Sequence, residues 1–192
     1  DLGESRFGAG MDAFLEVLGD TGSMLATIEP FIVKSSLGCP FLIVSEGQLI
    51  SHVRAPSPNE FTQIISLVNA CVTACETCEA TMIVDFEGEL SGHGGELTVA
   101  QLQITSTVDS RTLMPRPIPE GPPCTLGLLL DLRTAPCIAV IRQVVESAHI
   151  TKLMWGAAGD VESLMYQEQP TVFQFRPVCI VDVQKAFNGL GL

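Results

Sequence analysis

The chain has 192 residues, of which 46% are hydrophobic and 17% are charged; this composition allows a domain with a sizeable core and excludes a disordered polypeptide. Ten basic residues against 22 acidic ones give a formal net charge of -12, which is the wrong sign for a domain that binds nucleic acid through its phosphates unaided. No apolar run approaches the roughly 18 residues that span a bilayer, so we expect no membrane segment.

The seven cysteines are an odd number in a chain with a normal-sized core. This pattern predicts reduced thiols, and therefore an intracellular, reducing compartment, because a disulfide framework uses paired cysteines in small secreted chains. The chain begins at Asp1 without a recognisable targeting segment, so the sequence does not distinguish a mitochondrial, nuclear or cytoplasmic location.

We interpret residues 1–40 as an N-terminal extension that packs on the following domain, residues 41–192, or on a partner protein. Within the extension, Met11 to Leu18 has the spacing of one short amphipathic helix. Residues 41–45 predict a short strand. Residues 59–77 predict an amphipathic helix, because apolar side chains recur there every three or four residues: Phe61, Ile64, Val68, Cys71 and Cys75.

Cys71, Cys75 and Cys78 have the C-x3-C-x2-C spacing of the cluster motif of radical-SAM enzymes. On the predicted helix the three residues share one face among apolar neighbours, where cysteine is commonly buried. We therefore favour buried thiols and keep an iron–sulfur cluster as the alternative.

Residues 82–88, Met-Ile-Val-Asp-Phe-Glu-Gly, form an apolar run that ends in two carboxylates, Asp85 and Glu87. Side chains alternate along a strand, so these two carboxylates point to the same face of the sheet. Paired carboxylates repel each other unless a cation or a proton lies between them, which makes this a hypothetical metal site. The alternative is a strand that has reached solvent. A glycine-rich turn and a second alternating strand follow over residues 89–104, which predicts a hairpin.

The segment 107–124 contains five prolines together with Arg111 and Arg116. We expect no regular structure there, and interpret the segment as a docking element or a disordered loop. Residues 125–132 predict a third buried strand, and Pro136 is placed to open a helix.

Residues 152–164 predict a short strand, a turn of small residues and a helix that carries Asp160 near its N-terminus. An acid in this position has an ordinary explanation as a helix cap. Residues 178–183 predict a further strand.

Two of these stretches resemble motifs of the ribonuclease D-like branch of the DEDD 3′-5′ exonuclease superfamily. Residues 83–104 contain an Asp-x-Glu strand end followed by Leu-x-x-x-Gln-Leu, and residues 152–164 keep the Asp and the Leu four positions later of a second motif. The order of the elements also matches. The resemblance implies an α/β, ribonuclease H-like fold: a mixed sheet, with an early antiparallel hairpin and later parallel strands, flanked by helices.

The same resemblance implies a 3′-5′ exonuclease that acts on RNA, or on DNA, with single-stranded nucleic acid as its partner. Asp85, Glu87 and Asp160 would then hold two Mg²⁺ or Mn²⁺ ions that activate water and stabilise the leaving 3′ oxygen.

Departures from the family pattern favour a rival hypothesis. Trp155 and Gly156 stand where the family tends to have His and Asn or Asp, and the third motif, with a Tyr and a final Asp, does not occur before Leu192. The rival is a catalytically inactive adaptor subunit of a large ribonucleoprotein, such as a mitochondrial ribosome. Its protein partners would dock on residues 107–124 and on the N-terminal extension.

Overall fold

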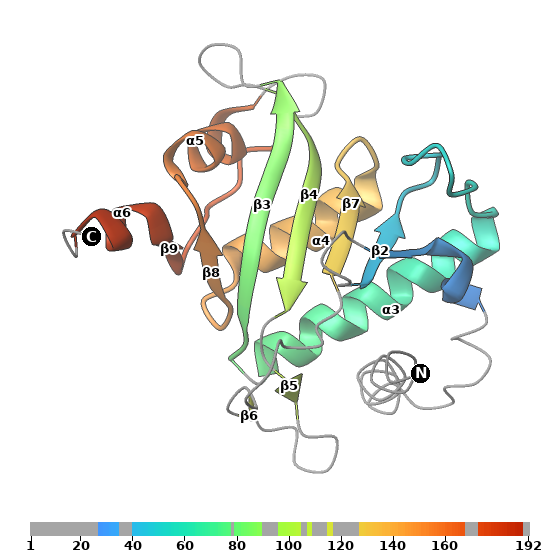
Figure 1. Ribbon diagram of the computed structural model, residues 1–192, viewed down its shortest axis with the longest axis horizontal. Helices are drawn as coiled ribbons and strands as arrows, with labels where there is room; N and C mark the ends of the chain where they lie inside the picture. Colours follow the sequence, from blue (N-terminus) through green and yellow to red (C-terminus); the bar gives the residue numbers. More distant parts are fainter. Residues whose placement is uncertain are drawn as a thin grey trace.

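The structure, a computed structural model, describes residues 27–34, 40–77, 79–89, 96–104, 107–108, 115–116, 127–167 and 173–189. Within these residues a seven-stranded mixed sheet has the strand order β1-β2-β7-β4-β3-β8-β9, and helices flank it (Figure 1). The expected ribonuclease H-like mixed sheet is therefore confirmed. None of the helices in the described part of the chain is long and apolar enough to cross a bilayer.

The strands are β1 (Ile32–Lys34), β2 (Pro40–Val44), β3 (Thr81–Glu89), β4 (Glu96–Ile104), β5 (Thr107–Val108), β6 (Pro115–Arg116), β7 (Gly127–Asp131), β8 (Thr151–Met154) and β9 (Ile180–Asp182). The helices are the 3-10 turn η1 (Glu29–Phe31), α3 (Pro58–Thr77), α4 (Ala135–Glu146), α5 (Ala158–Tyr166) and α6 (Val183–Gly189).

The centre of the sheet is the hairpin of β3 and β4, which the sequence predicted and which pairs in antiparallel fashion. On one side, β3 pairs in parallel with β8, and β8 pairs in parallel with β9. On the other side, β4 pairs antiparallel with β7, and β7 pairs in parallel with β2. The C-terminal ends of β3, β7, β8 and β9 consequently meet at one edge, where side chains from distant parts of the chain can converge.

Alternation along β3 gives the sheet two different faces. Met82, Val84 and Phe86 are buried, whereas Ile83, Asp85 and Glu87 are exposed. Helices α3 and α4 contact each other and cross behind the strands in Figure 1. We call the opposite face, which carries Ile83, Asp85 and Glu87, the carboxylate face.

Helix α3 confirms the helix predicted over 59–77. Its start is a capping box, in which the Ser57 backbone N–H donates to Glu60 Oε2 at 2.7 Å and the Glu60 N–H donates to Ser57 Oγ at 3.3 Å. Cys71 and Cys75 are buried on its core face, as the helical spacing predicted. Cys78 lies outside the described residues.

Part of the predicted N-terminal extension belongs to the core. Ile28 and Phe31 are buried, and β1 pairs antiparallel with β2. The predicted helix from Met11 to Leu18 lies outside the described residues, and the division at residue 40 stays a prediction.

The proline-rich segment 107–124 corrects one expectation. The prediction of no regular structure is wrong at β5 and β6, which pair with each other as a two-stranded sheet. The pairing places Thr107 opposite Arg116 and Val108 opposite Pro115, so proline is accommodated in a sheet that has only edge strands. The remainder of the segment lies outside the described residues.

Candidate functional site

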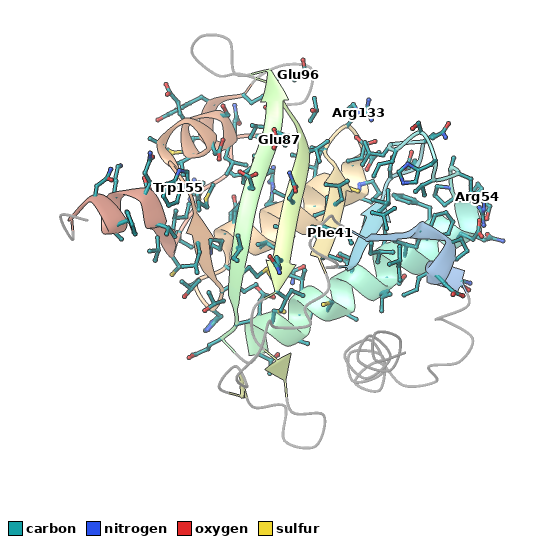
Figure 2. The ribbon with its side chains drawn as sticks, viewed as in Figure 1. Phe41, Arg54, Glu87, Glu96, Arg133 and Trp155 are labelled. Atoms are coloured by element: carbon teal, nitrogen blue, oxygen red, sulfur yellow. The ribbon has the colours of Figure 1, made fainter. Side chains whose placement is uncertain are left out.

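Asp85 and Glu87 lie on β3, on the carboxylate face, as their spacing predicted. The register places Asp85 opposite Gln101 of β4 and Glu87 opposite Val99. Figure 2 shows Glu87 on the upper part of β3. Both carboxylates are exposed, so a ligand can reach them from this face.

A β-bulge fixes where Glu87 stands. The register of β3 and β4 shifts between Glu87 and Gly88. A Cβ atom at Gly88 would lie 1.8 Å from the main-chain oxygen of Glu96, so only glycine permits the close approach of the two backbones. Bulges of this kind redirect the neighbouring side chain and occur often next to functional sites.

Gln101 contacts the site from the neighbouring strand. Its Nε2 donates to Glu87 Oε1 at 3.4 Å. This residue is the Gln of the Leu-x-x-x-Gln-Leu pattern in the sequence, and the contact gives that pattern a physical role: it restricts the orientation of the Glu87 carboxylate.

Asp160 is the third residue of α5 and is only 9% exposed. Burial, together with the negative charges of Asp85 and Glu87, raises the pKa of its carboxyl to about 6. The explanation of Asp160 as a helix cap is wrong: the N-cap of α5 is Ala157, and no side chain makes a capping hydrogen bond there. Asp160 is therefore a desolvated carboxylate that interacts electrostatically with the pair on β3.

Three carboxylates with this arrangement supply the oxygen ligands that a hard cation prefers. A cation near them would favour the ionised form of Asp160, which burial and the charges of Asp85 and Glu87 disfavour. Among the residues that the structure describes, no three His, Cys, Asp or Glu side chains are close enough together to form a complete metal cage. The charges of the three carboxylates interact, but the side chains do not come close enough together to form such a cage.

The loop after β8 keeps a polar brace despite its altered motif. Gly156 has φ +67, a left-handed conformation that favours glycine. Its backbone N–H donates to Asp182 Oδ1 at 3.3 Å, and the backbone N–H of Lys185 donates to the same oxygen at 3.1 Å. Asp182 at the end of β9 thus ties the loop to α6, a function that the sequence did not reveal.

A second acidic group near the site was missed. Asp131 ends the apolar strand β7 in the same way that Asp85 ends its own apolar run, and this pattern could have revealed it. Asp131 accepts from Ser45 Oγ at 2.7 Å and from Arg133 Nε at 2.8 Å. Burial opposes its charged form, but the hydrogen bonds from Arg133 and Ser45 outweigh burial and lower the pKa of the carboxyl. Asp131 is therefore ionised and forms a structural ion pair with Arg133.

Lys152 on β8 is a buried cation that the sequence also did not reveal. It is 0% exposed, and its Nζ donates to the carbonyl oxygen of Ser147 at 2.7 Å. Burial lowers the pKa of the ammonium group to about 8, although the neighbouring Cys179 and Glu76 act in the opposite direction.

Comparison with known proteins gives similar structures but no sequence family. No family model matches the chain, and no curated protein matches it. Trypanosoma brucei RNase D in complex with GMP is 16% identical and has a TM-score of 0.45, with 66% of this chain and 33% of that chain covered. The same enzyme in complex with RNA U12 is 13% identical, with a TM-score of 0.47 and coverage of 85% and 42%.

The Aedes aegypti Nibbler EXO domain is 13% identical, with a TM-score of 0.42 and coverage of 66% and 53%. The chain thus spans between a third and about half of the length of these proteins.

The strand order, the hairpin that carries Asp85 and Glu87, and Asp160 at the start of α5 define a mixed α/β fold with carboxylates on neighbouring elements. The ribonuclease D-like proteins that the sequence motifs resemble are among the solved structures similar to this chain.

Proposed function

We propose that this chain is a metal-dependent 3′-5′ exonuclease domain that acts on single-stranded RNA, and less readily on DNA. The observation that carries the proposal is the buried carboxylate of Asp160, whose pKa is raised to about 6 by burial and by the charges of Asp85 and Glu87. A buried carboxylate with a strongly raised pKa beside other carboxylates is typical of sites that hold a cation or a proton. A carboxylate with only a structural role would be paired, as Asp131 is.

Asp85, Glu87 and Asp160 would hold Mg²⁺ or Mn²⁺ in this proposal. The bound cations would supply Lewis-acid stabilisation of the phosphoryl and leaving 3′ oxygens and would activate the attacking water. The protein orients the ligands: Gln101 restricts Glu87, and the position of Asp160 in the first turn of α5 fixes its carboxylate. The brace from Asp182 to the loop before α5 limits movement of that helix start.

The test uses the full-length protein and single-stranded RNA labelled at its 5′ end. With Mg²⁺ or Mn²⁺, the RNA should shorten from its 3′ end, and chelation with EDTA should stop the reaction. Asp85→Asn and Asp160→Asn should each lower the rate by at least about a hundredfold, since each removes a metal ligand. Glu162→Gln, an exposed change on the same helix, is the matched control and should retain the rate of the wild type.

Metal binding provides a second measurement that needs no substrate. A cation that binds only the folded state raises the melting temperature with the logarithm of its concentration. Mn²⁺ should stabilise the wild type and not Asp85→Asn. Folded protein that neither shortens RNA nor responds to Mn²⁺ would overturn the proposal and leave the adaptor hypothesis.

A further inference from the structure

Two aromatic side chains are exposed at the edge of the sheet where β8 and β9 end. Trp155, directly after β8, is 62% exposed, and Phe187 of α6 is 46% exposed. Their ring centroids are 6.5 Å apart with an interplanar angle of 49°. Phe31, Phe173 and Phe175 are buried in the core, whereas Trp155 and Phe187 contact each other at the surface, so the pair is accessible to a ligand or a partner.

The register of the sheet places Trp155 next to the proposed catalytic site. Parallel pairing aligns Ile83 of β3 with Leu153 of β8. Asp85 lies two residues beyond Ile83 on β3, and Trp155 lies two residues beyond Leu153, directly after the end of β8; paired neighbouring strands lie about 4.8 Å apart. Figure 2 shows Trp155 between α6 and β3, with Glu87 further along β3. Trp155 thus directly follows the strand that pairs with β3, and β3 carries the proposed metal ligand Asp85.

The backbone that follows Trp155 is braced by hydrogen bonds before any ligand binds. Gly156 and the first turn of α6 are joined through the carboxylate of Asp182, as described above. Space on the other side of the loop is also limited, because a Cβ atom at Gly156 would lie 3.0 Å from Gln184 Oε1. A platform that is fixed in advance loses less entropy on binding than a mobile side chain would lose.

We propose that Trp155, supported by Phe187, forms a stacking platform for a base of the single-stranded RNA whose 3′ end lies at Asp85 and Glu87. This inference rests on the proposed exonuclease function and names how the substrate is recognised. A net charge of -12 limits how much affinity phosphate contacts can provide. Stacking on aromatic rings supplies affinity that does not depend on the sign of the charge and tolerates any base sequence.

Trp155 reports on its own contacts, because it is the one tryptophan in the 192 residues. A single-stranded RNA 12-mer, added in EDTA so that cleavage does not occur, should quench the tryptophan fluorescence. An abasic strand of the same length keeps the phosphates and removes the bases, so it should leave the fluorescence unchanged. Equal quenching by both strands, or no quenching while fluorescence anisotropy shows that labelled RNA is bound, would overturn the proposal.

Affinity changes give an independent test, with anisotropy of labelled RNA as the readout. Trp155→Ala should weaken binding roughly 5- to 150-fold, the range for loss of one stacked base. Trp155→Phe should recover most of the affinity, and Phe187→Ala should lose part of it. Tyr166→Ala is the matched control, because Tyr166 is 61% exposed but lies at the far end of α5. Equal effects of Trp155→Ala and Tyr166→Ala contradict the platform.

These measurements separate the platform from the catalytic proposal. RNA that quenches Trp155 but is never shortened in Mg²⁺ would retain the platform and overturn the exonuclease function. RNA that is shortened with the same kcat/KM by wild type and Trp155→Ala would retain the exonuclease function and overturn the platform. A fluorescence change that depends on protein concentration without RNA would mean that a second copy covers the pair, and it too overturns the platform.

Discussion

Replacement of Asp160 by asparagine should stabilise the metal-free protein at neutral pH. The carboxyl of Asp160 has an ordinary pKa of 3.8 and a folded-state pKa of about 6. This difference corresponds, at 1.36 kcal/mol per pKa unit, to about 3 kcal/mol. Because the folded pKa is raised, Asp160 contributes most to stability below pH 3.8, where it is protonated in both states, and the contribution is lost as the pH rises through about 6.

The expected result is a difference between two pH profiles. In EDTA, the free energy of unfolding of wild type relative to Asp160→Asn should fall by up to about 3 kcal/mol between about pH 4 and pH 7. Urea denaturation measured at several pH values within this range supplies both profiles. Glu162→Gln removes a negative charge from the exposed side of the same helix and should reproduce the pH dependence of the wild type.

A cation should reverse the effect. Mn²⁺ at neutral pH should stabilise wild type and not Asp160→Asn, because the cation compensates the charges that make ionised Asp160 unfavourable. The reasoning is refuted if wild type and Asp160→Asn keep a constant difference in unfolding free energy from pH 4 to pH 7 in EDTA. In that case Asp160 would be equally solvated in the folded and unfolded chains.

Three further changes test the surroundings of the site. Gly88→Ala should lower the free energy of unfolding by about 1–3 kcal/mol and lower the RNA-shortening rate, because its methyl group would overlap the main-chain oxygen of Glu96. An unchanged melting temperature would contradict the bulge. The stability of Lys152→Met relative to wild type should be higher below about pH 8 than above about pH 10.5, by up to about 3 kcal/mol, because the pKa of the buried ammonium is lowered from 10.5 to about 8. Urea melts across this pH range would show a constant difference if the ammonium were solvated. Ser45→Ala should lower the free energy of unfolding, measured by chemical denaturation, by about 1–3 kcal/mol, since it removes a 2.7 Å hydrogen bond to the buried carboxylate of Asp131. An unchanged free energy of unfolding would mean that water replaces the hydroxyl.

Local patterns in the sequence were sufficient for the elements that control the site. Alternation placed Asp85 and Glu87 on one face of β3, and helical periodicity identified α3 with an error of one residue at its start. These patterns are reliable because each depends on neighbouring residues and on one buried face. Asp160 was selected by its motif, and its role as a metal ligand stays a prediction; the structure places it in the first turn of α5, 9% exposed.

Contacts between distant residues could not be predicted in the same way. The sequence shows neither that Asp182 would accept hydrogen bonds from the loop at Gly156 nor that Lys152 would be buried. A single lysine in a short strand usually indicates exposure, and only the pairing of β8 between β3 and β9 encloses it. Residues 32–34 were likewise assigned to an extension, because a three-residue strand has too short a pattern to recognise.

The position of β2 in the sheet has a consequence for how the protein is made. Its partner β7 lies far downstream, and the contact from Ser45 to Asp131 joins residues 86 positions apart. While a ribosome synthesises the intervening chain, the apolar strand from Phe41 to Val44 has no partner along that edge. Unpaired apolar edges promote aggregation, and long-range parallel pairing forms slowly. A nascent chain that stalls before β7 should therefore require a chaperone, whereas one released after β7 can close the sheet.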